Sequence, residues 1–232
     1  MKFDVEDKDT LVMLSAGMES MIMLHALKKR LTSRLGAIFI NVGQYSNERQ
    51  LAYAKRVCNE LGVHLEYVDI PNLRNLLVAY SEPPYEMVTE GGLDARIPRG
   101  SCMIQTMSTI YAAYHKYKYV YYGGTKSDIA RVPNLPQLVS TVETVVRLNT
   151  GIPISVKAPF IEMTDDEVLQ LGIDEDINLS ESWSCIWGHL YHCGDCERCQ
   201  KRKSVFSKLE IADPTRYMNE REIAKLGSAT LG

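Results

Sequence analysis

The amino-acid sequence predicts an α/β fold, a doubly wound parallel sheet followed by a small cysteine-containing C-terminal lobe. Short apolar runs alternate with helical patterns, a turn of small residues follows the first run, and four cysteines gather near the C-terminus. With 232 residues, 45% of them hydrophobic, the chain can bury one substantial core with an appended piece. We expect the main domain to span residues 1–178 and the lobe to span residues 179–232.

Strands and helices alternate over the first third of the chain. The second predicted helix has the clearest boundaries, because Ser46 or Asn47 can cap its start and Gly62 stands at its C-cap position. A strand, helix, strand order predicts parallel pairing with right-handed crossovers. The predicted elements, starting with a strand, are 10–14, 19–30, 36–43, 46–62 and 64–70.

The next part of the chain begins with a different composition. Residues 80–100 are polar and rich in Pro and Gly, which predicts a long loop. We then expect a helix over 102–117, a strand over 119–124 that ends in a glycine turn, and a short capped helix over 164–172.

Charge and hydropathy argue against two classes of protein. The net charge of −3 disfavours a surface that binds nucleic acid throughout, and the aromatic and basic run 114–122 is better interpreted as a helix end leading into a strand. No apolar run approaches the roughly 20 residues of a membrane span, and the start does not resemble a signal peptide. We therefore expect a cytoplasmic protein without a membrane partner.

The turn after the first strand is a candidate phosphate-binding loop. In LVMLSAGMES, residues 11–20, an apolar strand ends in Ser15, Ala16 and Gly17 just before a predicted helix. Ligands of doubly wound sheets bind at the carboxyl ends of strands, and a helix N-terminus attracts phosphate. The alternative is an ordinary tight turn capped by Ser15, and these residues alone leave both interpretations open.

Four cysteines near the C-terminus have the spacing of a metal site. They follow the pattern C-x7-C-x2-C-x2-C, which lets four thiolates close a tetrahedral zinc site on a knuckle containing Gly194. Such a site has no open position, so the zinc would be structural. His189 and His192 could compete as ligands, but we expect them to be surface or substrate-side residues. We expect Cys58 and Cys102 to pack, with the alternative that Cys102, which begins the helix after IPRGS, lies near the site. The predicted zinc ligands are Cys185, Cys193, Cys196 and Cys199.

The loop and the cysteine knuckle together resemble the 7-cyano-7-deazaguanine synthase (QueC) family over nearly the whole chain. Intermediate segments agree: NVGQ (41–44) resembles the family's YGQ, and IPRGS (97–101) stands where the family has a VPGRN-like turn before a helix. GGTKSDIARVP (123–133) is similar to the family's G-x4-D-x4-P stretch, and APF followed by MTDDEV (163–168) resembles the family's APL and next helix.

The resemblance implies an ATP pyrophosphatase of the adenine-nucleotide α-hydrolase type. Such an enzyme adenylates the carboxylate of 7-carboxy-7-deazaguanine with ATP and Mg²⁺, and ammonia displaces AMP on the way to the nitrile. The implied catalytic residues are Ser15, Glu19, Ser20, Lys126 and Asp128. The implied nucleotide-binding residues are Leu14, Ser15, Ala16, Gly17, Met18, Glu19, Ser20, Gln44 and Gly124. The implied substrate-binding residues are Arg99, Ser101, Asp128 and Arg131.

The sequence also departs from the family's patterns. Family loops usually read SGGxDS, whereas Ala16 replaces a glycine here and Glu19 replaces the aspartate. RVPN (131–134) stands where the family commonly has GYPD, and Arg99 and Gly100 are reversed relative to GRN. These departures fall where we expect contacts to the base or the acyl group.

Several activities fit these residues. The chain could form the nitrile, or give the activated deazaguanine to another amine such as an amino group of a partner protein. The second activity resembles a branch of QueC-like proteins encoded in antiphage operons. It could also bind nucleotide without turnover. A tRNA-modifying ATP pyrophosphatase is a further alternative, although the charge disfavours it. Family resemblance also implies a homodimer.

Overall fold

The computed structural model describes residues 5–70, 98–131, 134–219 and 222, without the side chains of 98–101 and 131. Five parallel strands form one sheet in the order β3-β2-β1-β4-β5. Val12 in the central strand lies opposite Ala37 on one side and Tyr121 on the other. The strands are β1 (Thr10–Met13), β2 (Leu35–Asn41), β3 (His64–Asp69), β4 (Tyr119–Tyr121) and β5 (Ser155–Lys157).

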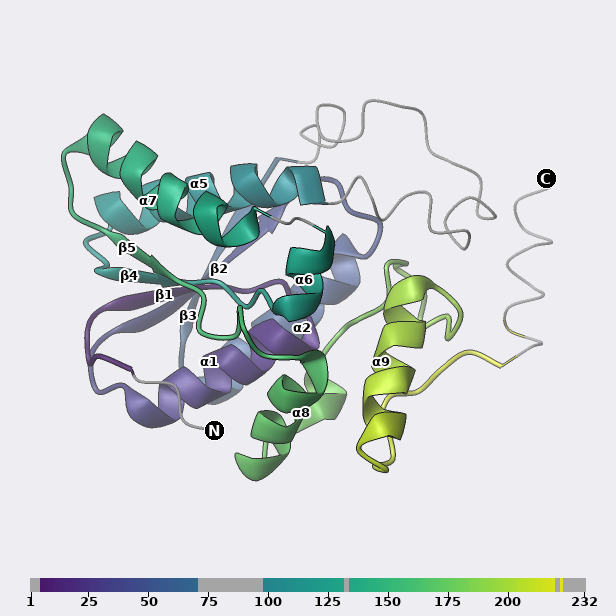
Figure 1. The fold of residues 1–232 in the computed structure, drawn as a ribbon. Helices are drawn as coiled ribbons and strands as arrows, with labels where there is room; N and C mark the ends of the chain where they lie inside the picture. The colour runs from purple at the N-terminus through teal and green to yellow at the C-terminus, as the bar shows by residue number, and fades with distance from the viewer. Residues whose placement is uncertain (1–4, 71–97, 132–133, 220–221, 223–232) are drawn as a thin grey trace.

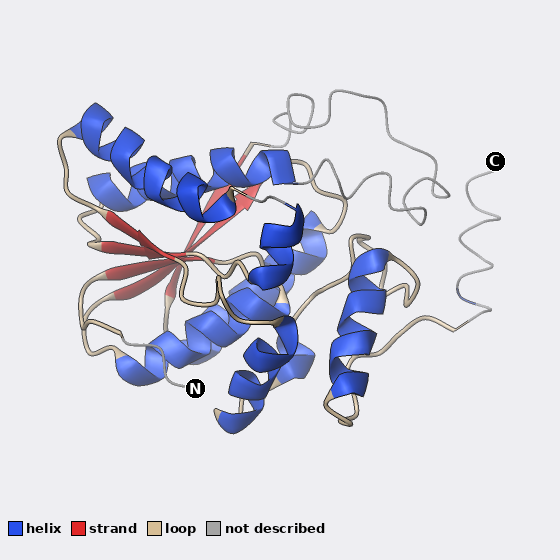
Figure 2. Ribbon diagram, in the orientation of Figure 1, coloured by secondary structure: helices blue, strands red, loops and turns tan. Residues whose placement is uncertain are grey.

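Helices cover both faces of this sheet (Figure 1). Helices α5 and α7 lie over one face, and α1, α2 and α8 lie over the other, while α6 and α9 lie beyond the carboxyl ends of the strands (Figures 1 and 2). The helices are α1 (Met18–Arg30), α2 (Asn47–Leu61), α5 (Pro98–Tyr114), α6 (Lys126–Arg131), α7 (Leu135–Thr150), α8 (Asp165–Asp174) and α9 (Glu197–Lys208), with a 3₁₀ turn η3 (Leu179–Glu181).

Alternation along β1 divides the core into two layers. Leu11 and Met13 pack with α5 and α7, whereas Val12 and Leu14 pack with α1 and α8. All four side chains are buried, as expected for a parallel strand covered on both faces. Order 3-2-1-4-5 reverses beside β1, so the turn after β1 opens at the switch point of the sheet.

The predicted strand and helix order is confirmed, with two differences. Pro98–Ser101 form the first turn of α5 and not a separate turn before it, since proline suits the first helical position. Of the predicted loop 80–100, residues 80–97 lie outside the described residues. Helices α6, α7 and α9 and strand β5 were not among the predicted elements. Strand β5 has only three residues, too few for a pattern, whereas α7 carries a signal in Pro136 near its start and Gly151 at its C-cap.

The structure confirms some of the predictions made for the two isolated cysteines and the tyrosine run, and contradicts one. Cys58 is buried as expected, but the packing predicted for Cys102 is wrong because its side chain is exposed. In the run 114–122, α5 ends at Tyr114 and β4 begins at Tyr119, which confirms a helix end leading into a strand. In the part of the chain that the structure describes, no helix is long and apolar enough to cross a membrane.

An ion pair joins α1 to the end of α8. Arg30 Nη2 donates to Glu175 Oε1, and Lys29 Nζ lies 3.6 Å from Glu175 Oε2. The hydrogen bond from Arg30, opposed by partial burial, lowers the pKa of Glu175 from its ordinary value of 4.5. A carboxyl group with a lowered pKa stabilises the fold above pH 4.5 and loses this contribution as the pH falls.

We expect Glu175→Gln to reduce the free energy of unfolding by about 1 kcal/mol at pH 7, and the difference from the wild type to shrink below pH 4.5. Urea denaturation at several pH values measures this. Glu60→Gln, at an exposed position of α2, is the control. A difference that stays constant with pH would show that the ion pair does not contribute through charge.

Candidate functional site

The loop from Ser15 to Ser20, called the phosphate loop below, is held by its own hydroxyl groups. Ser15 Oγ and Ser20 Oγ lie 3.2 Å apart and share a hydrogen bond. Ser15 Oγ also accepts from Gly17 N–H at 3.3 Å, and Ser20 Oγ donates to the Gly17 carbonyl at 3.0 Å. Two hydroxyls therefore converge beside the start of α1.

Ala16 adopts a left-handed conformation in this loop, with a φ of 60°. This conformation costs a residue with a side chain roughly 1–2 kcal/mol, which glycine avoids. The Ala16 side chain is fully buried, and its carbonyl accepts from Trp183 N–H at 2.8 Å. The methyl group that replaces the family's glycine is therefore accommodated by packing and by a contact from the C-terminal lobe.

This loop can bind an anion mainly through its backbone N–H groups. Gly17 is the N-cap of α1 and provides no side-chain cap, so the first N–H groups of the helix face the loop. A Cβ at Gly17 would lie 3.2 Å from Ser15 Oγ and 3.4 Å from Glu19 Oε2. The side chains of Leu14 and Met18 are buried, so these predicted ligand residues can contribute through the backbone alone.

The turn after β4 lies against the first turn of α1. A Cβ at Gly123 would lie 3.3 Å from Ser20 N, and one at Gly124 would lie 2.4 Å from the Tyr122 ring. Burial, followed by the nearby charge of Asp128, raises the pKa of Tyr122 well above its ordinary range, so the phenol stays protonated. The two glycines thus let this turn approach the phosphate loop closely.

Helix α6 brings Lys126 and Asp128 to the carboxyl ends of the strands, where the phosphate loop also lies. Asp128 Oδ2 accepts from Thr125 N–H at 2.9 Å and so caps the start of α6. Lys126 extends an exposed side chain, while its backbone N–H donates to the Met163 carbonyl. Asp128 therefore has a local structural role besides the catalytic and substrate-binding roles predicted for it.

Lys201, which the sequence analysis did not select, also lies beside the phosphate loop. Its Nζ is 2.9 Å from Asp165 Oδ1, 2.9 Å from Ser127 Oγ and 3.6 Å from Glu19 Oε1. Burial alone would lower the pKa of Lys201, but the carboxylates of Glu19 and Asp165 outweigh it and raise the pKa. Nothing in the local sequence around Lys201 predicts that it lies near Glu19, because only folding brings α9 to the loop.

A cavity of about 360 Å³ lies between α6, α8 and α9. Three lysines, Lys126, Lys201 and Lys208, line it together with Asp165 and Asp166. Lys201 pairs with Asp165, and Lys208 Nζ lies 2.8 Å from Asp166 Oδ1. The cavity borders the phosphate loop through Lys201, which contacts Glu19.

The other predicted ligand residues are less closely joined to the loop. Gln44 follows β2, where its Oε1 accepts from Val42 N–H at 2.9 Å and holds the local turn. Arg99 and Ser101 lie in the first turn of α5, and Arg131 ends α6, but their side chains lie outside the described part of the structure. Their substrate-binding roles stay predictions.

Two fully buried polar residues of α5 were also missed. Gln105 and Ser108 lie on one helix face with Ala112, which packs in the same core layer as β1 and β4. Among the residues that the structure describes, neither the Gln105 amide nor the Ser108 hydroxyl has a hydrogen-bond partner. The sequence pattern of an apolar helix does not predict that its glutamine is buried without a hydrogen-bond partner.

The four predicted cysteine ligands converge into one buried cluster. Their sulphur atoms all lie within 4.8 Å of one another, with 3.9 Å between Cys193 and Cys199 and between Cys185 and Cys196. Tetrahedral zinc with Zn–S bonds of about 2.3 Å places its sulphur ligands about 3.8 Å apart. Gly194, with a φ of +81°, allows the tight knuckle.

Backbone amides also support thiolates here. Cys185 Sγ accepts from Trp187 N–H and Cys193 N–H, and Cys193 Sγ accepts from Cys196 N–H at 3.2 Å. The spacing suits a single ion better than a four-iron cluster, in which each thiolate binds a different iron and the sulphurs lie farther apart. The cluster therefore fits one tetrahedral metal ion.

His192 supports the knuckle from inside, so the expectation of a surface or substrate-side position is wrong. Its side chain is buried, its ring lies 4.3 Å from Trp183, and its Nε2 accepts from Ser184 N–H at 2.9 Å. Burial lowers the pKa of His192 to about 4, which keeps the ring neutral and able to accept this bond. His189 is half-buried beside Trp187.

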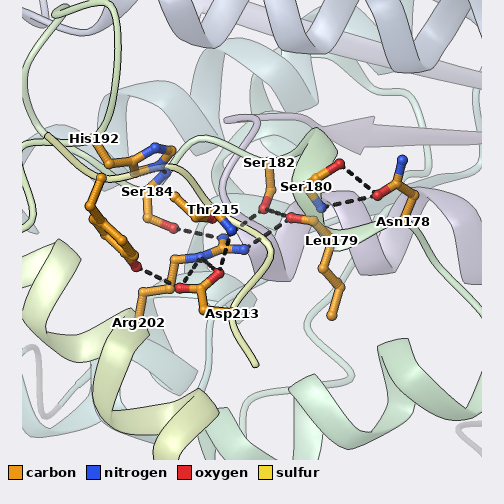
Figure 3. A network of polar contacts seen from close by, with 10 residues as sticks. Asn178, Leu179, Ser180, Ser182, Ser184, His192, Arg202, Asp213 and Thr215 are labelled. Carbon is orange, nitrogen blue, oxygen red and sulfur yellow. Dashed lines mark hydrogen bonds and ion pairs between the residues drawn. The ribbon is translucent and has the colours of Figure 1, made fainter. Parts of the chain in front are cut away.

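Arg202 connects the segments around the knuckle (Figure 3). Its guanidinium donates to both carboxylate oxygens of Asp213 at 3.1 Å, to Ser182 Oγ at 2.7 Å and to the Leu179 carbonyl at 2.9 Å. The side chain is 1% exposed, so its charge is stabilised almost entirely by these partners. The network fixes α9 against the segment that contains Trp183 and Cys185.

Comparison with known proteins identifies the family of this chain. A model of the family described as queuosine biosynthesis protein QueC matches residues 9–210. A 7-cyano-7-deazaguanine synthase 1 from Sulfurisphaera tokodaii is 29% identical over 90% of this chain and 98% of its own length. A 7-cyano-7-deazaguanine synthase from Methanobrevibacter smithii is 25% identical over 90% of this chain and 98% of its own length.

Solved structures share the fold at lower identity. The U34-tRNA thiolase NcsA from Methanococcus maripaludis, with its [4Fe-4S] cluster, has a TM-score of 0.52 and 18% identity over 89% of this chain and 67% of its own. NMN synthetase from Francisella tularensis has a TM-score of 0.52 and 11% identity over 94% of this chain and 82% of its own. These two structures share the parallel sheet and its covering helices with this chain. Since the family model spans most of its length, the chain belongs to the QueC family.

Proposed function

We propose that the protein is an ATP-dependent ligase that activates the carboxylate of 7-carboxy-7-deazaguanine and transfers the acyl group to an amine. The observation that carries the proposal is the phosphate loop at the switch point of the sheet, in a chain of the QueC family. The names of the relatives favour 7-cyano-7-deazaguanine as the product of ammonia transfer.

The loop residues suit the pyrophosphate part of ATP. Hydroxyls of Ser15 and Ser20, with the N–H groups at the start of α1, provide donors for phosphate oxygens. The space that a Cβ at Gly17 would fill is the space a phosphate group needs. Glu19 would hold Mg²⁺, which neutralises charge on the leaving pyrophosphate.

These groups would act mainly by positioning. The carboxylate oxygen of the substrate attacks the α-phosphorus of ATP, the α–β bond breaks, and pyrophosphate leaves. The amine then attacks the acyl carbon, AMP leaves, and an amide forms. Forming the nitrile requires a second activation of the amide oxygen. Lys126 and Asp128 stand at the same edge of the sheet and are the proposed partners of the reacting groups.

Structural zinc is the proposed ion of the cysteine cluster. Four thiolates would leave it no open position, so it would stabilise the lobe and take no part in catalysis. The domain division at residues 178 and 179, cytoplasmic location and a homodimer stay predictions from the sequence. A protein amino group as acceptor is a second candidate, favoured by the departures from the family pattern at 99–101 and 131–134, where we expect contacts to the base or the acyl group.

Mass spectrometry of a reaction with Mg²⁺, ATP, 7-carboxy-7-deazaguanine and ammonium tests the function. We expect AMP, pyrophosphate and the nitrile, with no AMP when the carboxylate substrate is omitted. AMP without the nitrile would direct the search to another amine, including protein amino groups. No AMP formation with the intact, metal-loaded protein would contradict the proposed ligase.

We expect Gly17→Ala to weaken ATP binding by about tenfold or more, because the added methyl group enters the phosphate space. Gly17 has a φ of −66°, so alanine fits the backbone, but its methyl group would push on Ser15 Oγ, 3.2 Å away; we expect the melting temperature to change far less than the affinity. Gly62→Ala is a control with the opposite expectation. Gly62 has a φ of +61°, which strains alanine, so stability should fall; it lies at the end of α2 with open space around it, so ATP binding should not change. Calorimetric titration and thermal melting would then separate binding from stability, and equal ATP affinity in all three proteins would contradict the phosphate-loop assignment.

Elemental analysis should find one zinc ion per chain and no iron. We expect Cys196→Ser to lose the metal and to melt at a lower temperature, since metal binding contributes to folding. Cys102→Ser, at an exposed cysteine outside the cluster, should keep both metal and stability. Full metal content in Cys196→Ser would show that the ion is bound elsewhere.

A further inference from the structure

We propose that Lys201 is a positioning residue for Glu19, through which the cysteine lobe sets the geometry of the nucleotide site. This inference rests on the proposed function, because it assigns Glu19 to the Mg²⁺ and ATP site. It adds a residue outside the phosphate loop, on a helix that belongs to the metal-binding lobe.

The ammonium group of Lys201 bridges two elements of the main domain. Its Nζ lies 2.9 Å from Asp165 Oδ1 at the start of α8 and 2.9 Å from Ser127 Oγ in α6. Asp165 Oδ1 also accepts from Thr125 Oγ1 at 2.8 Å. The position of the charge is thus fixed by partners other than Glu19, and Glu19 Oε1 lies 3.6 Å from it.

The two oxygens of Glu19 have different surroundings. Oε1 faces Lys201, whereas Oε2 lies 3.4 Å from the Cβ position of Gly17, over the phosphate loop. Attraction between Oε1 and the ammonium group therefore turns Oε2 toward the space where phosphate and Mg²⁺ would bind. The side chains of Lys201 and Glu19 are 26% and 25% exposed, so water screens the pair only in part.

The cysteine lobe fixes the position of Lys201 relative to the phosphate loop. Its neighbours along α9 are Cys199, in the buried cysteine cluster, and Arg202, in the buried network with Asp213. Glutamate rather than aspartate at position 19 suits this arrangement, because its extra methylene lets one carboxylate span the gap from the loop to α9. Lys201 and the longer carboxylate thus form a matched pair.

The test compares Lys201→Met with Lys208→Met in the full-length, metal-loaded protein. Lys208 lies two turns further along α9, pairs with Asp166 at 2.8 Å and lines the same cavity, but no contact joins it to Glu19 in the described structure. Calorimetry measures the affinity for a non-hydrolysable ATP analogue with Mg²⁺ and without added Mg²⁺, in a buffer free of chelators so that the cysteine cluster keeps its metal. We expect Lys201→Met to lose about five- to tenfold in affinity with Mg²⁺ but little without it, and Lys208→Met to match the wild type.

Two further variants separate positioning from a general effect on folding. Lys201→Arg keeps the charge and should recover most of the Mg²⁺-dependent affinity, while Glu19→Gln should lose it. The double variant Glu19→Gln, Lys201→Met should bind no more weakly than Glu19→Gln alone, since Lys201 acts through Glu19. Thermal melting and zinc content of each variant report on the fold and the lobe.

The outcomes also separate this inference from the proposed function. Equal affinity of Lys201→Met and Lys208→Met, or losses that add in the double variant, would overturn the role of Lys201 while the wild type still binds Mg²⁺ and ATP. A wild-type protein that binds no ATP analogue would overturn the proposed function itself.

Discussion

The hydrogen bond from Trp183 N–H to the Ala16 carbonyl is the constraint on which the rest of this site depends. It joins the cysteine lobe to the most strained residue of the phosphate loop, where φ is 60°. A left-handed alanine persists only when its surroundings hold it. Burial of the Ala16 methyl group and this bond from the lobe provide that support.

The buried cysteine cluster and the Arg202 network hold this contact in place. Trp183 lies between the buried serine Ser182, which accepts from Arg202, and the segment that leads to Cys185. Its ring also packs against His192, one residue before Cys193. A buried charge whose partners come from three segments strongly disfavours any displacement of those segments. The lobe therefore acts as a rigid support for the loop.

Opposite charges also meet where the cysteine lobe contacts the main domain. Three carboxylates, Glu19, Asp128 and Asp165, lie around the ammonium group of Lys201, which keeps a raised pKa despite its burial. Without this cation the carboxylates would repel one another and the phosphates of a nucleotide. Polar contacts at the carboxyl edge of the sheet thus connect α1, α6, α8 and α9, elements that are distant in sequence.

Local sequence was sufficient for the features that depend on short spacing. Apolar runs and caps predicted the strand and helix order, with Gly62 ending α2 in the left-handed conformation and Thr164 forming a capping box with Glu167. Cysteine spacing predicted the convergence of four sulphur atoms, because these cysteines come from one short segment. The turn after β1 predicted phosphate binding for the same reason, and that role stays a proposal.

Tertiary structure alone decided which distant side chains meet. No periodicity relates Lys201 to Glu19, or Trp183 to Ala16, because these contacts form only when the lobe packs on the sheet edge. Burial likewise distinguished His192, an internal acceptor, from the surface residue expected of it. The sequence by itself determined the first strands and helices and the grouping of the four cysteines, since these rest on local spacing. The charge environment of the loop required the fold, since electrostatic contacts depend on distance in space.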